Sequence, residues 1–298
     1  MSRFYFHHTI ALFYFVLITA APTANGSDDG FVPLFNGEDL SGWQLAGDET
    51  MSFSVKDGAI YCDGSGNYPH WLRTEKMYEN FVLQFEFKIE GWCENGLYIH
   101  APLFGRCSKV GLEFQICHDS GASWKSSGAI FPIVPPAVAA GEKRGEWNTA
   151  EIIMEWPRYH AILNGETIQD INLDQHPELK YRNRSGYIGL QDNGWRSWVR
   201  NIRIKELPSK ETWIPLFNKK NLDGWKLHGG GEWRVENGTL IASNGHGHLV
   251  NEHVFEDVEI QMYIRTENVA NGGVFFRWVS EEDRGREIQI FTNPDANH

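Results

Sequence analysis

Alternating apolar and polar residues give the strongest signal along this chain. The segment 81–89 carries apolar residues at every odd position, from Phe81 to Ile89, and mostly polar residues between them. A period of two places successive side chains on opposite faces of an extended backbone, so the segment is predicted to form a half-buried strand. Residues 258–265 alternate in the same way and predict a second strand of this kind.

Many shorter segments also have the pattern of strands. We expect them at residues 52–55, 59–61, 96–100, 112–117, 149–155, 160–163, 185–191 and 199–205. Turn-forming pairs such as Asp57-Gly58 and Asn164-Gly165 separate some of them at hairpin spacing. Many short strands with few helical stretches predict an all-β sandwich. Periodicity does not choose between a jelly roll and an immunoglobulin-like sandwich.

The chain contains an internal repeat. Residues 31–45 return as residues 213–227 with the same Pro-Leu-Phe-Asn and Gly-Trp groups in the same order. Two further echoes follow, 53–58 in 233–238 and 111–116 in 285–290. A chain of 298 residues is expected to hold about two domains. We therefore predict a complete domain at 31–207 and a second, truncated copy at 213–298.

The first residues have the layout of a secretory signal peptide at 1–24. Arg3 lies in a short polar start, an apolar run extends from Ile10 to Ile18, and small residues follow. The run is short for a membrane-spanning helix, and no later stretch is apolar enough to cross a membrane. We expect an exported protein, periplasmic or extracellular, without a membrane span after signal removal.

The net charge and the composition indicate which classes of ligand the chain can bind. The formal net charge is −12, and no basic run is present to bind phosphates, which argues against nucleic acid. Aromatic residues make up 13% of the chain. An acidic, aromatic-rich chain is compatible with neutral ligands such as saccharides, because sugar rings pack on flat aromatic faces.

All four cysteines lie in the first copy, at positions 62, 93, 107 and 117. In an oxidising compartment four cysteines allow three pairings, and the sequence does not choose among them. Cys93 with Cys107 would close the shortest plausible cross-strand loop. Zinc is disfavoured because no Cys-x-x-Cys pair occurs.

The strand at 112–117 is the best candidate for a functional site. Its period places Glu113, Gln115 and Cys117 on one face and three apolar residues on the other. A carboxylate and a carboxamide about 7 Å apart can bind vicinal hydroxyls. Glu113 or Asp119 could also act as a general base. A solvent-facing strand is the alternative, but Glu287 and Gln289 repeat the pair in the second copy.

Other residues are weaker candidates. His100 ends a predicted strand and could act in acid-base catalysis, although a structural role is equally compatible. No cofactor is predicted. A divalent metal on His100, Glu113, His118 and Asp119 is an alternative that lacks tight ligand spacing. Trp124 could stack on a sugar ring. Motifs of serine hydrolases, zincins and dinucleotide enzymes are absent from the sequence.

Several ordered motifs together resemble one known family. They are Leu34-Phe-Asn-Gly37, Gly111-x-Glu-x-Gln115, Ser127-Gly-Ala-Ile-Phe131, Val134-Pro-Pro136, Gly145-Glu-Trp-Asn148, Leu163-Asn-Gly165, Gly189-Leu-Gln-Asp192 and Arg200-Asn-Ile202. In this combination the chain resembles the 3-keto-disaccharide hydrolase domain family, also described as 3-keto-glucoside 1,2-lyases and hydratases. The resemblance covers nearly all of 31–207 and, for the second copy, 213–298.

The resemblance implies a concanavalin A-like jelly roll that acts on glycosides oxidised at C3. A ketone at C3 acidifies the C2 proton, so a single base can start elimination, and water then adds back. Glu113, Asp119 or His100 would supply the base. Gln115, Gln191, Asn193, Arg200 and Trp124 would bind the sugar.

Three positions depart from the pattern of the family. Asn193 stands where relatives carry His, His100 where they often carry Arg, and Phe131 where they often carry Tyr. A non-catalytic carbohydrate-binding module is therefore the main alternative, and a scaffold domain without a small ligand is a third interpretation. The incomplete second copy is expected to pair with another chain and could form an oligomer.

Overall fold

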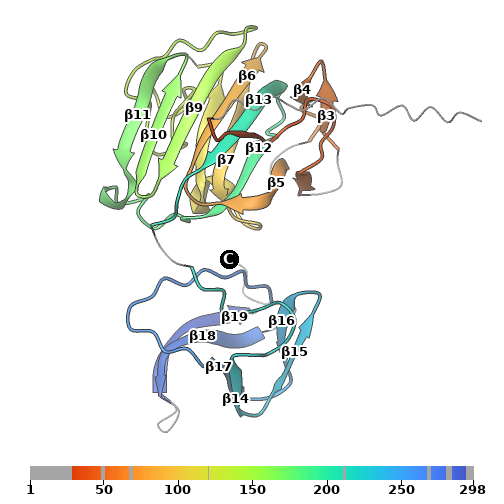
Figure 1. Ribbon diagram of the computed structural model, residues 1–298, viewed down its shortest axis with the longest axis vertical. Coiled ribbons are helices and arrows are strands. Elements are labelled where there is room, and N and C mark those ends of the chain that lie inside the picture. The colour runs from red at the N-terminus through yellow and green to blue at the C-terminus, as the bar shows by residue number, and fades with distance from the viewer. Residues whose placement is uncertain are drawn as a thin grey trace, which may run out of the picture.

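The structure is a computed structural model that describes residues 29–47, 51–66, 70–119, 121–210, 213–266, 270–279 and 284–292. These residues form two units, one on each side of residues 211–212 (Figure 1). The predicted signal peptide at 1–24 lies outside the described residues. Within the described ranges, no helix has the length and apolar character that crossing a membrane requires.

The first unit is built from two antiparallel sheets. The larger sheet has the order β11-β10-β9-β6-β13-β4-β3, with β1 paired to β13. Its strands are β1 (Val32–Pro33), β3 (Phe53–Lys56), β4 (Ala59–Cys62), β6 (Phe81–Ile89), β9 (Asn148–Glu155), β10 (Arg158–Leu163), β11 (Glu166–Asn172) and β13 (Ser197–Glu206). A short 3-10 helix, η1 (Leu173–Gln175), follows β11.

The second sheet has five strands in the order β2-β5-β12-β7-β8. They are β2 (Trp43–Ala46), β5 (Trp71–Tyr78), β7 (Glu94–Ala101), β8 (Leu112–Cys117) and β12 (Gly186–Gln191). The single helical turn α1 (Cys107–Val110) lies in the connection between β7 and β8. This sheet carries the residues of the candidate site.

The core lies between the two sheets. The odd positions of β6, from Phe81 to Ile89, are all buried, as the period of two predicts. Phe85 of the larger sheet packs edge-on against Phe114 of β8, with ring centroids 5.6 Å apart. The predicted all-β jelly-roll sandwich is confirmed. Four strands of this unit were not predicted: β1 and β2 are short, with two and four residues, and Arg73 to Met77 of β5 and most of β11 do not alternate clearly.

The second unit contains three separate strand pairs. They are β14 (Trp225–Gly229) with β17 (Gly247–Asn251), β15 (Glu232–Glu236) with β16 (Thr239–Ser243), and β18 (Ala270–Val279) with β19 (Arg284–Thr292). In chain order they correspond to β2 with β5, β3 with β4, and β7 with β8. Within the described ranges of this unit, β9 to β13 have no counterparts.

The predicted strand at 258–265 is wrong, because this segment forms no strand in the structure. Its equivalent in the first unit, β6, is bonded to β9 on one side and β13 on the other. Both neighbours lack counterparts in the described second unit, so the backbone donors and acceptors of 258–265 have no ladder to join. Its apolar side chains at Val258 and Ile264 are about half exposed.

The expected Cys93–Cys107 disulfide is also wrong, because all four cysteines are free and buried. Cys93 precedes β7 and Cys107 follows it. The eight residues of that strand rise about 3.3 Å each, which separates the two cysteines far beyond disulfide reach. Burial raises the pKa of each of these two thiols to about 12.

Candidate active site

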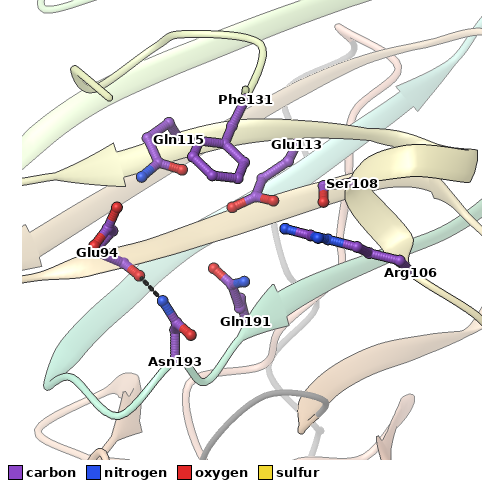
Figure 2. A pocket seen from close by; sticks show the side chains of 8 residues that line it. All are labelled: Glu94, Arg106, Ser108, Glu113, Gln115, Phe131, Gln191 and Asn193. Atoms are coloured by element: carbon purple, nitrogen blue, oxygen red, sulfur yellow. Dashed lines mark hydrogen bonds between the residues drawn. The ribbon is translucent and has the colours of Figure 1, made fainter. Parts of the chain in front are cut away.

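A small cavity of about 210 Å³ opens on the face of the five-stranded sheet that points away from the core. Its lining comes from β7, β8, β12, the α1 region and the segment after β8 (Figure 2). The lining residues are Glu94, Arg106, Ser108, Glu113, Gln115, Phe131, Gln191 and Asn193. The volume lies below the range of about 300–1,000 Å³ typical of drug-sized ligands, which suits a small polar ligand.

Strand alternation brings Glu113 and Gln115 to the cavity. Leu112, Phe114 and Ile116 of β8 join the core, as the sequence predicts. The alternative of a solvent-facing strand is excluded, because Glu113 is 2% exposed and Gln115 is 1% exposed. The segment 128–131 runs along the free edge of β8, where the backbone amide of Gln115 donates to the Ala129 carbonyl at 3.0 Å.

A glycine in the neighbouring strand makes room for the carboxyl group. In the register of β7 and β8, Gly96 faces Gln115 and Tyr98 faces Glu113. A Cβ atom at Gly96 would lie 2.4 Å from Glu113 Oε1, which is shorter than any tolerated contact. Only glycine at this position therefore lets the Glu113 side chain lie across β7.

Burial makes Glu113 an unusually basic carboxylate. Desolvation is the main cause that raises the pKa of Glu113 to about 8. The positive charge of Arg106 and the Ser108 hydroxyl act in the opposite direction, and the negative charge of Glu94 adds to the increase. A carboxyl group with a pKa near neutrality in a cavity is a candidate acid or base.

Three buried oxygens in the cavity lack hydrogen-bond donors. They are Glu113 Oε2, Gln115 Oε1 and Gln191 Oε1. Each unsatisfied buried acceptor costs about 1–3 kcal/mol, so buried oxygens of this kind are usually satisfied by a ligand or by water. In contrast, Asn193 Nδ2 already donates to the Glu94 carbonyl at 2.9 Å. The free acceptors match a ligand that brings several hydroxyl groups.

Five of the sequence-predicted residues lie in or beside the cavity. Glu113, Gln115, Gln191 and Asn193 line it. Trp124 lies beside the lining residue Phe131, at the rim of the cavity, with ring centroids 5.6 Å apart. Its side chain is 43% exposed, and Lys125 Nζ lies over its ring, 5.0 Å from the centroid.

His100 does not reach the cavity. It is fully buried, packs edge-on against Phe81, and has a backbone φ of 50° that turns the chain at the end of β7. Its two ring nitrogens lie 2.6 Å from the Glu79 carbonyl and 2.9 Å from the Asn183 carbonyl. Burial lowers the pKa of His100 to about 4. These contacts give His100 a structural role instead of the predicted catalytic one.

Asp119 and Arg200 are also placed elsewhere. Asp119 accepts hydrogen bonds from the Gly121 amide and the Ser123 hydroxyl in the loop after β8, which hold its pKa below the usual range and make it a weak base. Arg200 lies in the other sheet, where Nε donates to Glu86 at 2.8 Å. Its guanidinium stacks 3.8 Å from the centre of the Trp147 ring.

The site also contains residues that the sequence analysis missed. Glu94 could have been found, because continuing the period of two backward from Gly96 places it on the same face of β7. Arg106 and Ser108 lie in the β7–β8 connection, which has no strand period. Within the described ranges, no group of three or more His, Cys, Asp or Glu residues is arranged to hold a metal ion.

Comparisons with known proteins identify the family of the chain. The model of the 3-keto-alpha-glucoside-1,2-lyase-like domain family matches residues 30–205 and 212–298. The chain belongs to this family, and the prediction of a hydrolase or lyase is thereby supported.

One known protein and two crystal structures are similar to this chain. The chain is 24% identical over 229 residues to a 3-keto-disaccharide hydrolase of Bacteroides thetaiotaomicron, covering 60% of this chain and 79% of that protein. Two crystal structures of candidate glycosyl hydrolases from Parabacteroides distasonis share its fold. Both are 22% identical, with TM-scores of 0.54 and 0.52, covering 60% and 59% of this chain and 94% and 99% of theirs.

Proposed function

We propose that the first unit cleaves glycosides that carry a ketone at C3, by elimination followed by hydration. The observation that carries this proposal is Glu113, a buried carboxyl group with a pKa of about 8 and an unpartnered oxygen in a polar cavity. A base of this strength suits a C2 proton that is acidified by a neighbouring ketone. The 3-keto-disaccharide hydrolase similar to this chain supports the same substrate class.

The proposed reaction consists of proton abstraction, elimination of the leaving group and addition of water. The ionised Glu113 takes the C2 proton, and the electrons of the C2–H bond form an enolate with the C3 oxygen. The enolate then expels the C1 oxygen, which takes a proton from a water molecule and leaves as an alcohol, and a C1–C2 double bond remains. The hydroxide formed from that water adds to C1, and Glu113 returns to C2 the proton that it took. The sum is hydrolysis with no change of oxidation state.

The other residues of the cavity have binding roles in this proposal. Arg106 provides the positive charge near Glu113 and stabilises the enolate oxygen. The free oxygens of Gln115 and Gln191 accept hydrogen bonds from sugar hydroxyls. Trp124 packs against a ring face at the rim. We further propose that the protein acts after export, on the basis of the signal-peptide pattern in residues 1–24.

The proposal is tested with 3-keto-trehalose and trehalose, each with and without a chelator. We expect glucose release from the keto substrate alone, loss of release in Glu113→Gln, and full release in Glu90→Gln, whose carboxylate is exposed on the turn after β6. A chelator effect would reveal a metal. If wild-type protein releases nothing but either sugar raises its Tm, the chain is a binding module and the proposal fails.

A further inference from the structure

One contact between the two units lies close to the cavity. The hydroxyl oxygen of Tyr263 in the second unit accepts a hydrogen bond from the backbone amide of Leu103 in the first, at 3.0 Å. The Tyr263 ring also meets the ring of Phe104 edge-on, with centroids 6.1 Å apart. Leu103 and Phe104 belong to residues 102–106, the loop that leads from β7 to α1.

A second contact joins the segment 258–264 to the first unit. Glu259 forms an ion pair of 3.0 Å with Arg184 of the first unit. Tyr263 itself is 49% exposed, so its contact with the first unit covers only part of its side chain. The segment is therefore attached to the first unit at two residues, Glu259 and Tyr263.

The loop held by Tyr263 ends at a residue of the cavity. Arg106 follows Phe104 by two residues, lines the cavity, and acts electrostatically on Glu113 (Figure 2). The far end of the loop is anchored by α1, where the Val110 amide donates to the Arg106 carbonyl at 3.1 Å. The part of the loop around Phe104 packs less closely against the first unit, because the Phe104 side chain is 67% exposed.

We propose that Tyr263 is a positioning residue for the cavity of the first unit, which it reaches by anchoring the loop that carries Arg106. The second unit then contributes to the site without touching the sugar. The anchoring stands on the contacts alone, whereas its effect on turnover rests on the proposed function. Loss of the anchor frees Arg106 and weakens its positive charge at Glu113, so the pKa of Glu113 rises.

The first test does not need activity. Tyr263→Phe removes the hydroxyl but keeps the ring, and Tyr181→Phe is a matched control because Tyr181 is 82% exposed on the first unit. We expect hydrogen exchange of the Leu103 amide to rise at least about tenfold in Tyr263→Phe. A carbon NMR titration of the glutamate carboxyl groups, with Glu113→Gln assigning the signal, should show a higher pKa for Glu113. The other groups that face or approach Glu113 are Glu94, Ser108 and Cys107, and the substitution does not alter their contacts with it, so a change in the pKa of Glu113 reports on Arg106.

The second test uses turnover of the keto substrate. Losing one neutral hydrogen bond should reduce kcat/KM about fivefold in Tyr263→Phe and shift its pH profile upward. In the Arg106→Ala background the same substitution should have no further effect, because both act through one guanidinium. Unchanged Leu103 exchange and an unchanged Glu113 pKa would overturn the proposal, as would equal effects in Tyr181→Phe. An inactive wild-type protein would overturn only the proposed function, since exchange and titration still decide the anchoring.

Discussion

At the scale of the residue, the proposed chemistry depends on Glu113, a carboxyl group whose buried surroundings oppose its negative charge. Glu113 is buried between β7 and the segment 128–131, and its pKa is about 8. A glutamate with an ordinary pKa would be ionised at neutral pH. Glu113 instead holds its proton at neutral pH, and its carboxylate regains a proton readily after losing one. That behaviour suits a group that takes a proton from C2 and later returns it.

The pH profile follows from this pKa. Because the base must be ionised, we expect kcat/KM on a 3-keto-glycoside to rise with pH and level off above about 8. Glu94 adds to the raised pKa of Glu113. Glu94→Gln should therefore move the midpoint to lower pH, and Arg106→Lys, which retains charge, should leave it nearly in place. Profiles measured between pH 5 and 10 check both, and a flat profile would contradict the role of Glu113.

The raised pKa of Glu113 makes the folded state less stable as the pH rises. Below the unfolded pKa of about 4.5 both states hold the proton, so burial of Glu113 costs little. As the pH rises toward about 8, the unfolded chain ionises and the folded state loses stability, by roughly 3 to 5 kcal/mol at most. Glu113→Gln should match wild type at pH 4.5 and exceed it at pH 8 in urea unfolding. Lower stability of the variant at pH 8 would be the contrary result.

At the scale of the element, the pairing of β7 with β8 creates the site, and β18 with β19 repeats its geometry. Gly273 faces Gln289 and Phe275 faces Glu287, in the register of the first unit. A Cβ atom at Gly273 would lie 2.2 Å from Glu287 Oε1, as one at Gly96 would crowd Glu113. The repeat therefore preserves a packing relation as well as a sequence pattern.

This relation makes a matched pair of substitutions possible. Gly96→Ala should displace the Glu113 side chain and reduce kcat/KM more than about tenfold, because a contact of 2.4 Å forces the carboxyl group to move. Gly273→Ala makes the same change in the second unit and should leave turnover nearly unchanged. Steady-state kinetics of both variants, with circular dichroism to verify folding, checks the prediction. Equal losses in the two variants would contradict it.

Most strands of the first unit were predictable from the sequence, whereas the site was predictable only in part. Alternation located β6 and β8 with their observed ends, because each has one face in a core. It failed at 258–265, because the pattern reports amphipathic character and not whether neighbouring strands exist. It found Glu113 and Gln115 on one strand face. It could not exclude three other candidates. A bulge at the end of β7 turns His100 away from the cavity. Asp119 lies in the loop after β8, and Arg200 lies in the other sheet.

At the scale of the whole molecule, the two units differ in completeness. The first has a closed core between two sheets, whereas the described second unit consists of three strand pairs with exposed apolar residues. Ile288 and Phe291 are each 60% exposed, for example. Surfaces of this kind favour association with another chain, and the expected oligomer through this unit stays a prediction.

Limited proteolysis distinguishes the two units. We expect the first cleavage within the second unit, between β17 and β18, and a persistent fragment that contains the first unit. Size-exclusion chromatography with light scattering gives the oligomeric state of the same sample. A monomer whose residues 213–292 resist the protease as well as 29–210 do would contradict the difference in completeness.

The most direct test of the central claim is single-turnover cleavage of 3-keto-trehalose by wild type and Glu113→Gln in deuterium oxide. We expect wild type to place solvent deuterium at C2 of the released 3-keto-glucose, because the base exchanges its proton before returning it, and we expect Glu113→Gln to release nothing. Cleavage without deuterium at C2, or normal cleavage by Glu113→Gln, would contradict elimination with Glu113 as the base.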